Sequence, residues 1–187
     1  MIKKNINKVK DQFKDYNIDG YVIPKNDEFF SEYANNDRLK YISNFTGSAG
    51  YAVILKNRNY LFVDGRYTIQ AKIESGKNFK IVDYFKIIDT NIFKNLNLGI
   101  DPKLFTSEQI KKFFLKNNKV TIINDNLVDK IIKIKKKINS PFYSISTKIT
   151  GESHEQKISK VADYLKKNKS DYLFITAPEN IAWLLNI

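Results

Sequence analysis

Hydrophobic positions divide the first 138 residues into alternating helical and extended segments. Over residues 3–18, Ile6, Val9, Phe13 and Tyr16 recur at spacings of three and four, which predicts an amphipathic helix. Short apolar runs bounded by Gly, Pro, Asn or Asp predict buried strands. These runs cover residues 21–23, 51–55, 60–63, 79–82, 98–102 and 120–123.

Between two of these runs, the polar residues 56–59 predict the turn of a β-hairpin. Helical spacing returns over 67–73, 106–115 and 127–136. In the second of these segments Thr106 or Ser107 provides an N-cap, and the apolar face consists of Ile110, Phe113, Phe114 and Leu115. Helices that alternate with strands, with one hairpin inserted, predict an α/β sandwich: a central mixed β-sheet flanked by helices.

The pattern starts again after residue 138. Residues 139–141 (Asn-Ser-Pro) indicate a linker, and 154–168 indicate a second amphipathic helix. Three stretches of the first part return in the second. Residues 9–14 align without gaps with 161–166, residues 21–23 with 173–175, and residues 39–45 with 181–187. We therefore predict one complete domain over 1–138, followed over 139–187 by a linker and the truncated opening of a second, similar domain.

The net charge of +12 has two interpretations. It is compatible with a basic nucleic-acid-binding module, or with a lysine-rich solvated surface. The second is favoured, because only Arg38, Arg58 and Arg66 of the 32 basic residues are arginines, and base and phosphate recognition favours the arginine fork. No apolar run reaches the roughly 20 residues of a membrane span. The sequence has no cysteine and no signal-peptide core, so we expect a cytoplasmic protein without membrane contact.

No reaction centre is visible, and we assign no catalytic residue and no metal ligand. The single histidine, His154, stands at the start of a predicted helix and is expected at the surface. Asp64, Asp101 and Asp125 stand at strand ends, where α/β proteins often place functional groups. Each of them also has a structural role available, as a cap or a turn residue.

The most suggestive cluster is Asp64-Gly65-Arg66-Tyr67. Asp64 is placed to cap the helix that follows, Gly65 allows a sharp turn, and Arg66 offers a bidentate donor. The favoured interpretation is a capped hairpin-to-helix corner held by an internal Asp–Arg pair. The alternative is that this corner faces a substrate, with Arg66 as the contact.

Several short motifs resemble the N-terminal region of Xaa-Pro aminopeptidases, which belong to the creatinase/prolidase metallopeptidases. They occur in order over nearly the whole chain. They are Ser31-Glu32-Tyr33, Phe45-Thr46-Gly47-Ser48-Ala49-Gly50, Val63-Asp64-Gly65-Arg66-Tyr67 with Gln70-Ala71, Gly99-Ile100-Asp101-Pro102, the stretch 126–131 and the stretch 179–187. The longer members of this family have two related α/β domains before the catalytic domain, which agrees with the internal repeat.

The resemblance implies an enzyme that removes the N-terminal residue preceding proline, acting on peptides with proline at the second position. Family members use two divalent metal ions, commonly manganese, held by two Asp, one His and two Glu of a C-terminal catalytic domain. No segment of this sequence matches that domain, so the fragment is expected to hold no cofactor and to be inactive. The N-terminal domains of the family are associated with covering the catalytic cleft, selecting substrates and assembling a homo-oligomer. A sister dipeptidase or a creatinase-like hydrolase with the same domain layout stays open as an alternative.

Overall fold

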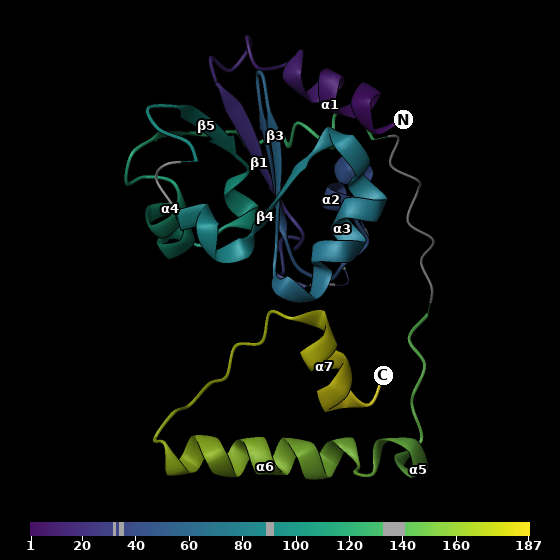
Figure 1. Ribbon diagram of the computed structural model, residues 1–187. Coiled ribbons are helices and arrows are strands. Elements are labelled where there is room, and N and C mark those ends of the chain that lie inside the picture. Colours follow the sequence, from purple (N-terminus) through teal and green to yellow (C-terminus); the bar gives the residue numbers. More distant parts are fainter. Residues whose placement is uncertain (32, 34–35, 89–91, 133–140) are drawn as a thin grey trace. The chain divides into compact units, whose positions relative to one another are not determined.

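The computed structural model describes residues 1–31, 33, 36–88, 92–132 and 141–187. The chain divides into two compact units (Figure 1). The first consists of residues 1–28 and 32–135, and the second of residues 29–31 and 136–187. Each unit has its own contacts and is described by itself.

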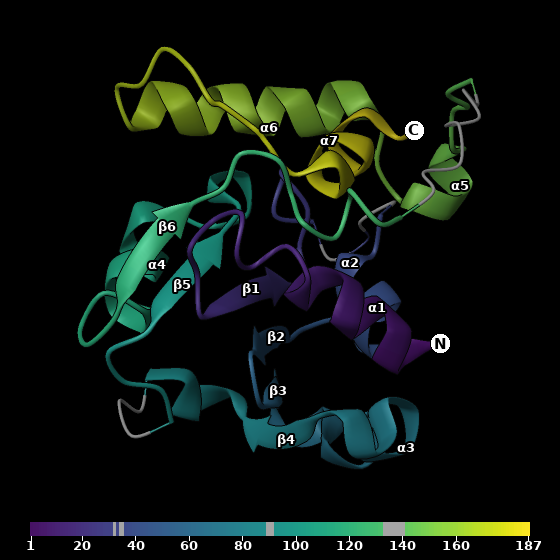
Figure 2. The same cartoon turned by 90° about the horizontal axis from the view of Figure 1, so that it is seen from above.

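Within the described residues, six strands of the first unit form one mixed sheet in the order β4-β3-β2-β1-β5-β6, which can be followed in Figure 2. β2 runs antiparallel to β1 and β3, and all other neighbouring pairs are parallel. The strands are β1 (Gly20–Pro24), β2 (Tyr51–Leu55), β3 (Asn59–Val63), β4 (Lys80–Asp83), β5 (Asn97–Ile100) and β6 (Lys119–Ile122). The sheet confirms the predicted α/β class, including the β2–β3 hairpin.

Helices cover both faces of this sheet (Figure 2). One face carries α1 (Ile2–Lys10), α2 (Arg38–Ser43) and α3 (Thr68–Ser75), and the other carries α4 (Ser107–Phe113). Short 3-10 helices connect the elements: η1 (Gly65–Tyr67), η2 (Gly76–Asn78), η3 (Tyr84–Ile88) and η4 (Pro102–Leu104). The N-cap of α4 is Thr106, one of the two predicted residues, and it forms a capping box in which Thr106 and Gln109 each accept a backbone N–H of the other.

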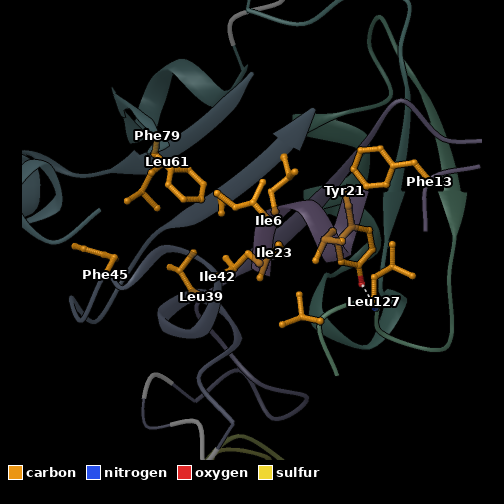
Figure 3. Close-up of a cluster of buried hydrophobic side chains, with 14 of the residues drawn as sticks. Ile6, Phe13, Tyr21, Ile23, Leu39, Ile42, Phe45, Leu61, Phe79 and Leu127 are labelled. Atoms are coloured by element: carbon orange, nitrogen blue, oxygen red, sulfur yellow. Dashed lines mark hydrogen bonds between the residues drawn. The ribbon is translucent and has the colours of Figure 1, made fainter. Parts of the chain in front are cut away.

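Alternation along the strands builds two hydrophobic layers. Tyr21 and Ile23 of β1 join the layer under α1 and α2, whereas Val22 between them joins the layer under α4. Figure 3 shows the first layer, in which Ile6 of α1 and Leu39 of α2 point toward the strand side chains. All five of these side chains are at most 3% exposed. Burial on both faces explains why the central strands are continuous apolar runs without alternating polar residues.

The first predicted helix is shorter than its hydrophobic spacing indicated. α1 ends at Lys10, and hydrogen-bonded turns lead from there to Asn17, which has a φ of +50°. These turns place Phe13 and Ile18 in the same layer as α1, each 2% exposed. Packing of Phe13 and Ile18 in this layer therefore replaces the last predicted helical turns. The chain can turn there because asparagine, at position 17, tolerates positive φ.

Residues 127–132, predicted as the start of a helix, form turns, and 133–136 lie outside the described residues. Side chains from distant elements bind some of the backbone groups of this segment. The Gln12 amide donates to the carbonyl of Leu127 (3.1 Å), and the N–H of Leu127 donates to the Tyr21 hydroxyl (3.4 Å). The segment keeps two i→i−4 backbone bonds, from Lys130 to Asn126 and from Ile132 to Val128, but these do not continue into a helix, so periodicity alone mispredicted it.

Two further predictions were wrong. Residues 173–175, which the repeat aligns with the predicted strand 21–23 and thereby predicts as a buried strand, pair with no strand among the described residues, and Leu173 and Phe174 are 55% and 89% exposed. A strand needs a hydrogen-bonded neighbour to be stable, and this segment has none in the part of the chain that the structure describes. Leu115 is 47% exposed because α4 ends at Phe113, before the position that the predicted apolar face included.

The second unit contains α5 (Thr147–Thr150), α6 (His154–Lys167) and α7 (Pro178–Leu185). Lys157 of α6 is only 3% exposed. Its ammonium donates to the carbonyl of Trp183 and to the side chain of Asn186, both at 2.7 Å, and lies 4.2 Å from the centroid of the Trp183 ring. One lysine thus ties α6 to the end of α7.

The first unit contains the same contact at corresponding positions, because the register that aligns residues 9–14 with 161–166 also places residue 5 opposite residue 157. Asn5 of α1 donates to the carbonyl of Tyr41 in α2 (3.0 Å), as Lys157 does to the carbonyl of Trp183. Both second helices also end in a left-handed asparagine, Asn44 with φ +65° and Asn186 with φ +55°. The internal repeat is therefore present in the three-dimensional contacts as well as in the sequence. Two helix pairs of this chain are built in the same way.

Candidate functional site

The predicted corner lies at the open end of the β2–β3 hairpin. Because Tyr51 pairs with Phe62 in antiparallel register, the loop before β2 and the turn after β3 meet at one place. The loop is Thr46–Gly50 and the turn is Asp64–Tyr67. We call these two segments together the hairpin corner.

Asp64 and Arg66 form the first part of the corner. An Asp64 oxygen accepts the backbone N–H of Arg66 (2.9 Å) and thereby caps η1. The Arg66 guanidinium donates to both carboxylate oxygens, with its shortest contact at 2.7 Å. This hydrogen bond from Arg66 is the main cause that holds the pKa of Asp64 below its ordinary range. The Arg66 side chain is 74% exposed and lies 5.2 Å from the centroid of the Tyr67 ring.

Tyr67 connects the turn to the loop. Its hydroxyl is hydrogen-bonded to the Ser48 hydroxyl at 2.8 Å, and its ring meets Phe45 edge to face at 5.7 Å. Phe45 is fully buried, and a Cβ on Gly47 would stand only 2.2 Å from its ring. The small residue at position 47 is therefore a packing requirement, because the loop passes directly over the buried ring.

A second polar group fixes the loop from the side of α3. Glu74 accepts from the backbone N–H of Thr46 (2.7 Å) and from the Thr46 hydroxyl (2.6 Å), and Gln70 donates to both residues. Partial burial raises the pKa of Glu74, but these hydrogen bonds and the charge of Lys40 outweigh it, so the pKa is lowered from 4.5. The folded hairpin corner therefore favours the carboxylate form of Glu74.

Replacement of Glu74 by glutamine is expected to destabilise the fold by about 1 kcal/mol at neutral pH, the typical net value of such hydrogen bonds. A lowered folded-state pKa means that the stabilisation is complete above the ordinary value of 4.5 and is lost as the pH falls through the folded value. Urea unfolding of both proteins between neutral and acidic pH should show the difference shrinking toward low pH. A difference that does not depend on pH contradicts this assignment.

Three of the carboxylates at strand ends cap the element that follows in the same way. Asp64, Asp83 and Asp101 each close a strand and accept the backbone N–H two residues on, at 2.9, 2.9 and 3.0 Å. Each thereby opens a 3-10 helix. Asp101 is also 2% exposed and accepts from Asn126 at 2.9 Å. Asp125 is exposed and stands three residues beyond β6. The hydrogen bond to Tyr16 is the main cause that raises the pKa of Lys130, and the charge of Asp125 contributes in the same direction.

One charged cluster was missed from the sequence. Arg38 is 4% exposed, and its guanidinium donates twice to Asp129 (2.8 Å each) and once to Glu28 (2.7 Å). Beside it, Lys25 forms an ion pair with Asp37, the N-cap of α2. The partners of Arg38 are 10 and 91 residues away, so no local pattern revealed them. The scarcity of arginine was the one available signal.

The remaining candidates do not gather into a reaction centre in the part of the chain that the structure describes. His154 is half exposed and lies 3.0 Å from Glu155, its sequence neighbour. No group of three or more His, Cys, Asp or Glu residues is arranged to hold a metal ion in the described ranges. Nor does any described helix have the length and apolar character needed to cross a bilayer.

Comparison with known proteins gives two matches to models of the creatinase/prolidase N-terminal domain, over residues 5–130 and 134–187. Xaa-Pro aminopeptidase 1 of Dictyostelium discoideum is 33% identical over 100% of this chain and 33% of its own length. Human Xaa-Pro aminopeptidase 2 is 28% identical over 96% of this chain and 29% of its own length. The chain thus spans about a third of the relatives that it matches.

Solved structures agree on the fold. An X-prolyl aminopeptidase from Caenorhabditis elegans, a cytosolic enzyme with a di-nuclear active site, superimposes with a TM-score of 0.77 and 23% identity, over 100% of this chain and 34% of that one. The N-terminal domain of the peptidase PepQ from Mycobacterium tuberculosis gives 0.53 at 17% identity, over 69% of this chain and 98% of that one. With its mixed sheet and two matched segments, this chain belongs to the creatinase/prolidase N-terminal domain family.

Proposed function

We propose that this chain forms the N-terminal part of an Xaa-Pro aminopeptidase, an enzyme that removes an N-terminal residue preceding proline. The observation that carries the proposal is the 33% identity to Xaa-Pro aminopeptidase 1 of Dictyostelium discoideum over the whole chain. Peptide bonds to proline lack the amide N–H, so they need dedicated peptidases. The human relative quoted above carries the same activity in its name.

The metal chemistry of such an enzyme does not fit the residues described here. The described residues bring together no three ligands for a metal ion, so we assign no metal-dependent step to this chain. We propose that two divalent ions, manganese being the family's common choice, belong to the catalytic domain of the whole enzyme. The C. elegans relative has a di-nuclear active site.

We further propose that residues 1–138 are one creatinase N-terminal-like domain and that 139–187 are a linker and the opening of a second one. Two facts support this division. A second family match covers residues 134–187, and the Asn5–Tyr41 contact of the first unit has its counterpart in Lys157–Trp183. The exposed segment 173–175 then corresponds to β1, which is buried in the first unit.

The role proposed for these domains is to cover the catalytic cleft, select substrates by length and assemble a homo-oligomer in the cytoplasm. Within the hairpin corner, the turn Asp64–Tyr67 is our candidate for a substrate-facing element. Its support is geometric: Asp64 holds the guanidinium of Arg66 at 2.7 Å while 74% of the Arg66 side chain stays exposed. A fixed and exposed guanidinium is suited to bind a carboxylate.

Two experiments test the proposed function. The chain alone, with manganese added, is expected to release no N-terminal residue from an X-Pro peptide. A chimera of the Dictyostelium enzyme, in which residues 1–187 replace the aligned region, is expected to cleave X-Pro peptides, whereas deletion of that region abolishes cleavage. In this chimera, Arg66→Gln should raise KM more than it lowers kcat if the corner meets substrate.

Three results contradict the proposal. Hydrolysis by the isolated chain shows that it holds its own catalytic centre. A folded but inactive chimera shows that the chain belongs to a different enzyme. Cleavage restricted to X-Pro dipeptides indicates a dipeptidase instead of an aminopeptidase. An unchanged KM in the Arg66→Gln chimera removes only the substrate role of the corner.

A further inference from the structure

One edge of the sheet in the first unit carries the amino ends of β1, β3, β4, β5 and β6, together with the carboxyl end of β2. We call it the amino edge. Two polar hollows open on it, one beside β3 and β4 and one beside β5 and β6. The opposite edge carries the strand-end carboxylates Asp64, Asp83 and Asp101. The hollows of the amino edge, in contrast, are lined mainly by cations and asparagines.

The first hollow has a volume of about 400 Å³ and is lined by Arg58, Lys77 and Lys80. No carboxylate lines it. All three cations are exposed, and none of them forms an ion pair within the described ranges. Three asparagines and Tyr60 complete the lining, and the exposed amide of Asn57 can both donate and accept hydrogen bonds.

The walls of the first hollow are joined to each other. The Asn59 amide at the start of β3 donates to the carbonyl of Asn78 in η2 (3.0 Å). The N–H of Leu55 donates to the carbonyl of Arg58 and closes the hairpin turn (2.8 Å). Lys80 stands in register with Tyr60 of the neighbouring strand. The backbone that carries the three cations is therefore fixed before any ligand arrives, which lowers the entropic cost of binding.

The second hollow, of about 650 Å³, contains Lys116, Lys119 and several asparagines. Asp19 is the one carboxylate among the residues that line either hollow. It is already engaged, because it pairs with Lys56 at 2.6 Å and accepts the backbone N–H of Asn97 at 2.9 Å. The pair with Lys56 is also the main cause that lowers the pKa of Asp19. Positive charge thus dominates both hollows.

We propose that the amino edge binds an extended acidic segment of a partner protein. Between β4 and β6 the edge crosses five strand spacings of about 4.8 Å, or about 24 Å, a distance that roughly seven extended residues cover. Lysines along this line attract carboxylates. The exposed amides of Asn17, Asn57, Asn95 and Asn117 match the donors and acceptors of a peptide backbone, whereas phosphates only accept.

The lining disfavours single-stranded nucleic acid as the occupant. Such ligands stack on exposed aromatic rings, and the one aromatic residue in either lining, Tyr60, is 5% exposed. Four of the five lining cations are lysines, which lack the bidentate fork that suits phosphate. The proposal does not depend on the aminopeptidase function, since it rests only on this edge.

The test is fluorescence anisotropy of the 187-residue chain with a labelled peptide of about eight glutamates, which spans the edge. A single-stranded oligothymidylate of equal charge is measured in parallel. The triple substitution R58E/K77E/K80E, and separately K116E/K119E, should each weaken peptide binding at least about tenfold. The neutral set R58Q/K77Q/K80Q should weaken it in the same direction, and circular dichroism confirms that each variant is folded.

The matched control is K3E/K72E/K111E, which changes the net charge as much as the first triple substitution does but leaves the amino edge intact. All three positions are exposed and line neither hollow. Peptide affinity should stay within about twofold of the parent. Equal loss in the control, no peptide binding at low salt, or binding of the oligothymidylate about tenfold tighter than the peptide each overturns the proposal.

Discussion

Replacement of Arg38 by methionine is expected to lower the free energy of unfolding by about 3 kcal/mol, which places it among the most damaging single substitutions in the chain. Arg38 is 4% exposed, and its guanidinium donates twice to Asp129 and once to Glu28. Burial alone would lower its pKa, but these two carboxylates outweigh burial and raise it. Without Arg38 both carboxylates lose their counter-charge beside the core. Their partial exposure keeps the cost at the lower end of the range for buried pairs.

Urea unfolding followed by circular dichroism measures this effect. Arg58→Met is the matched control, because Arg58 is exposed and has no ion pair in the described part of the chain, and its effect should stay below about 0.5 kcal/mol. The double variant with Asp129→Asn should cost less than the sum of the single variants, since the two side chains share one interaction. Equal effects of Arg38→Met and Arg58→Met contradict the assigned role.

The same substitution should loosen residues 126–132 specifically. This segment has no helix of its own, and besides the Arg38–Asp129 pair it is held by side chains such as Tyr41, whose hydroxyl donates to the carbonyl of Ile131 (3.1 Å). Hydrogen exchange at the amide of Leu127 should therefore become faster in Arg38→Met, whereas exchange in the central strand β1 should follow global stability alone. Uniform acceleration across the first unit speaks against a local anchor.

The strands and the hairpin could be predicted because their signal is local. A continuous run such as 51–55 is apolar wherever both faces of the sheet are covered, and its partner 60–63 lies four residues away. α2 was missed, because six residues give too few turns for periodicity to be recognised. Its Asp37 cap would have been the only local indication.

Non-local contacts also limited what could be predicted from the sequence at the hairpin corner. The Asp64–Arg66 pair spans two residues, so the spacing alone indicated it. In contrast, the Ser48–Tyr67 hydrogen bond depends on the antiparallel register that brings two turns together. For segment 127–132 the local helical spacing predicted a helix that does not form. Leu127 is bound there by side chains more than 100 residues away.

Replacement of Gly47 by alanine is the second change with a large expected effect, about 2–3 kcal/mol of destabilisation. The new methyl group would stand 2.2 to 2.9 Å from three atoms of the Phe45 ring. That ring is fully buried and is held edge to face by Tyr67, so it has no free space to move into. The strain therefore spreads into the loop that carries Ser48.

Gly65 in the same corner is the matched control, because a Cβ there meets nothing within 4 Å and its backbone does not need positive φ. Gly65→Ala should change the free energy of unfolding by less than about 0.5 kcal/mol. Thermal and urea unfolding of both variants measure the contrast. If the two substitutions cost the same, the close packing of the loop on Phe45 is not what requires glycine at position 47. If only Gly47→Ala is damaging, the glycine of the Phe45-Thr46-Gly47-Ser48 motif is required for packing. The exposed guanidinium of Arg66 is then the group of the hairpin corner that is suited to bind a substrate.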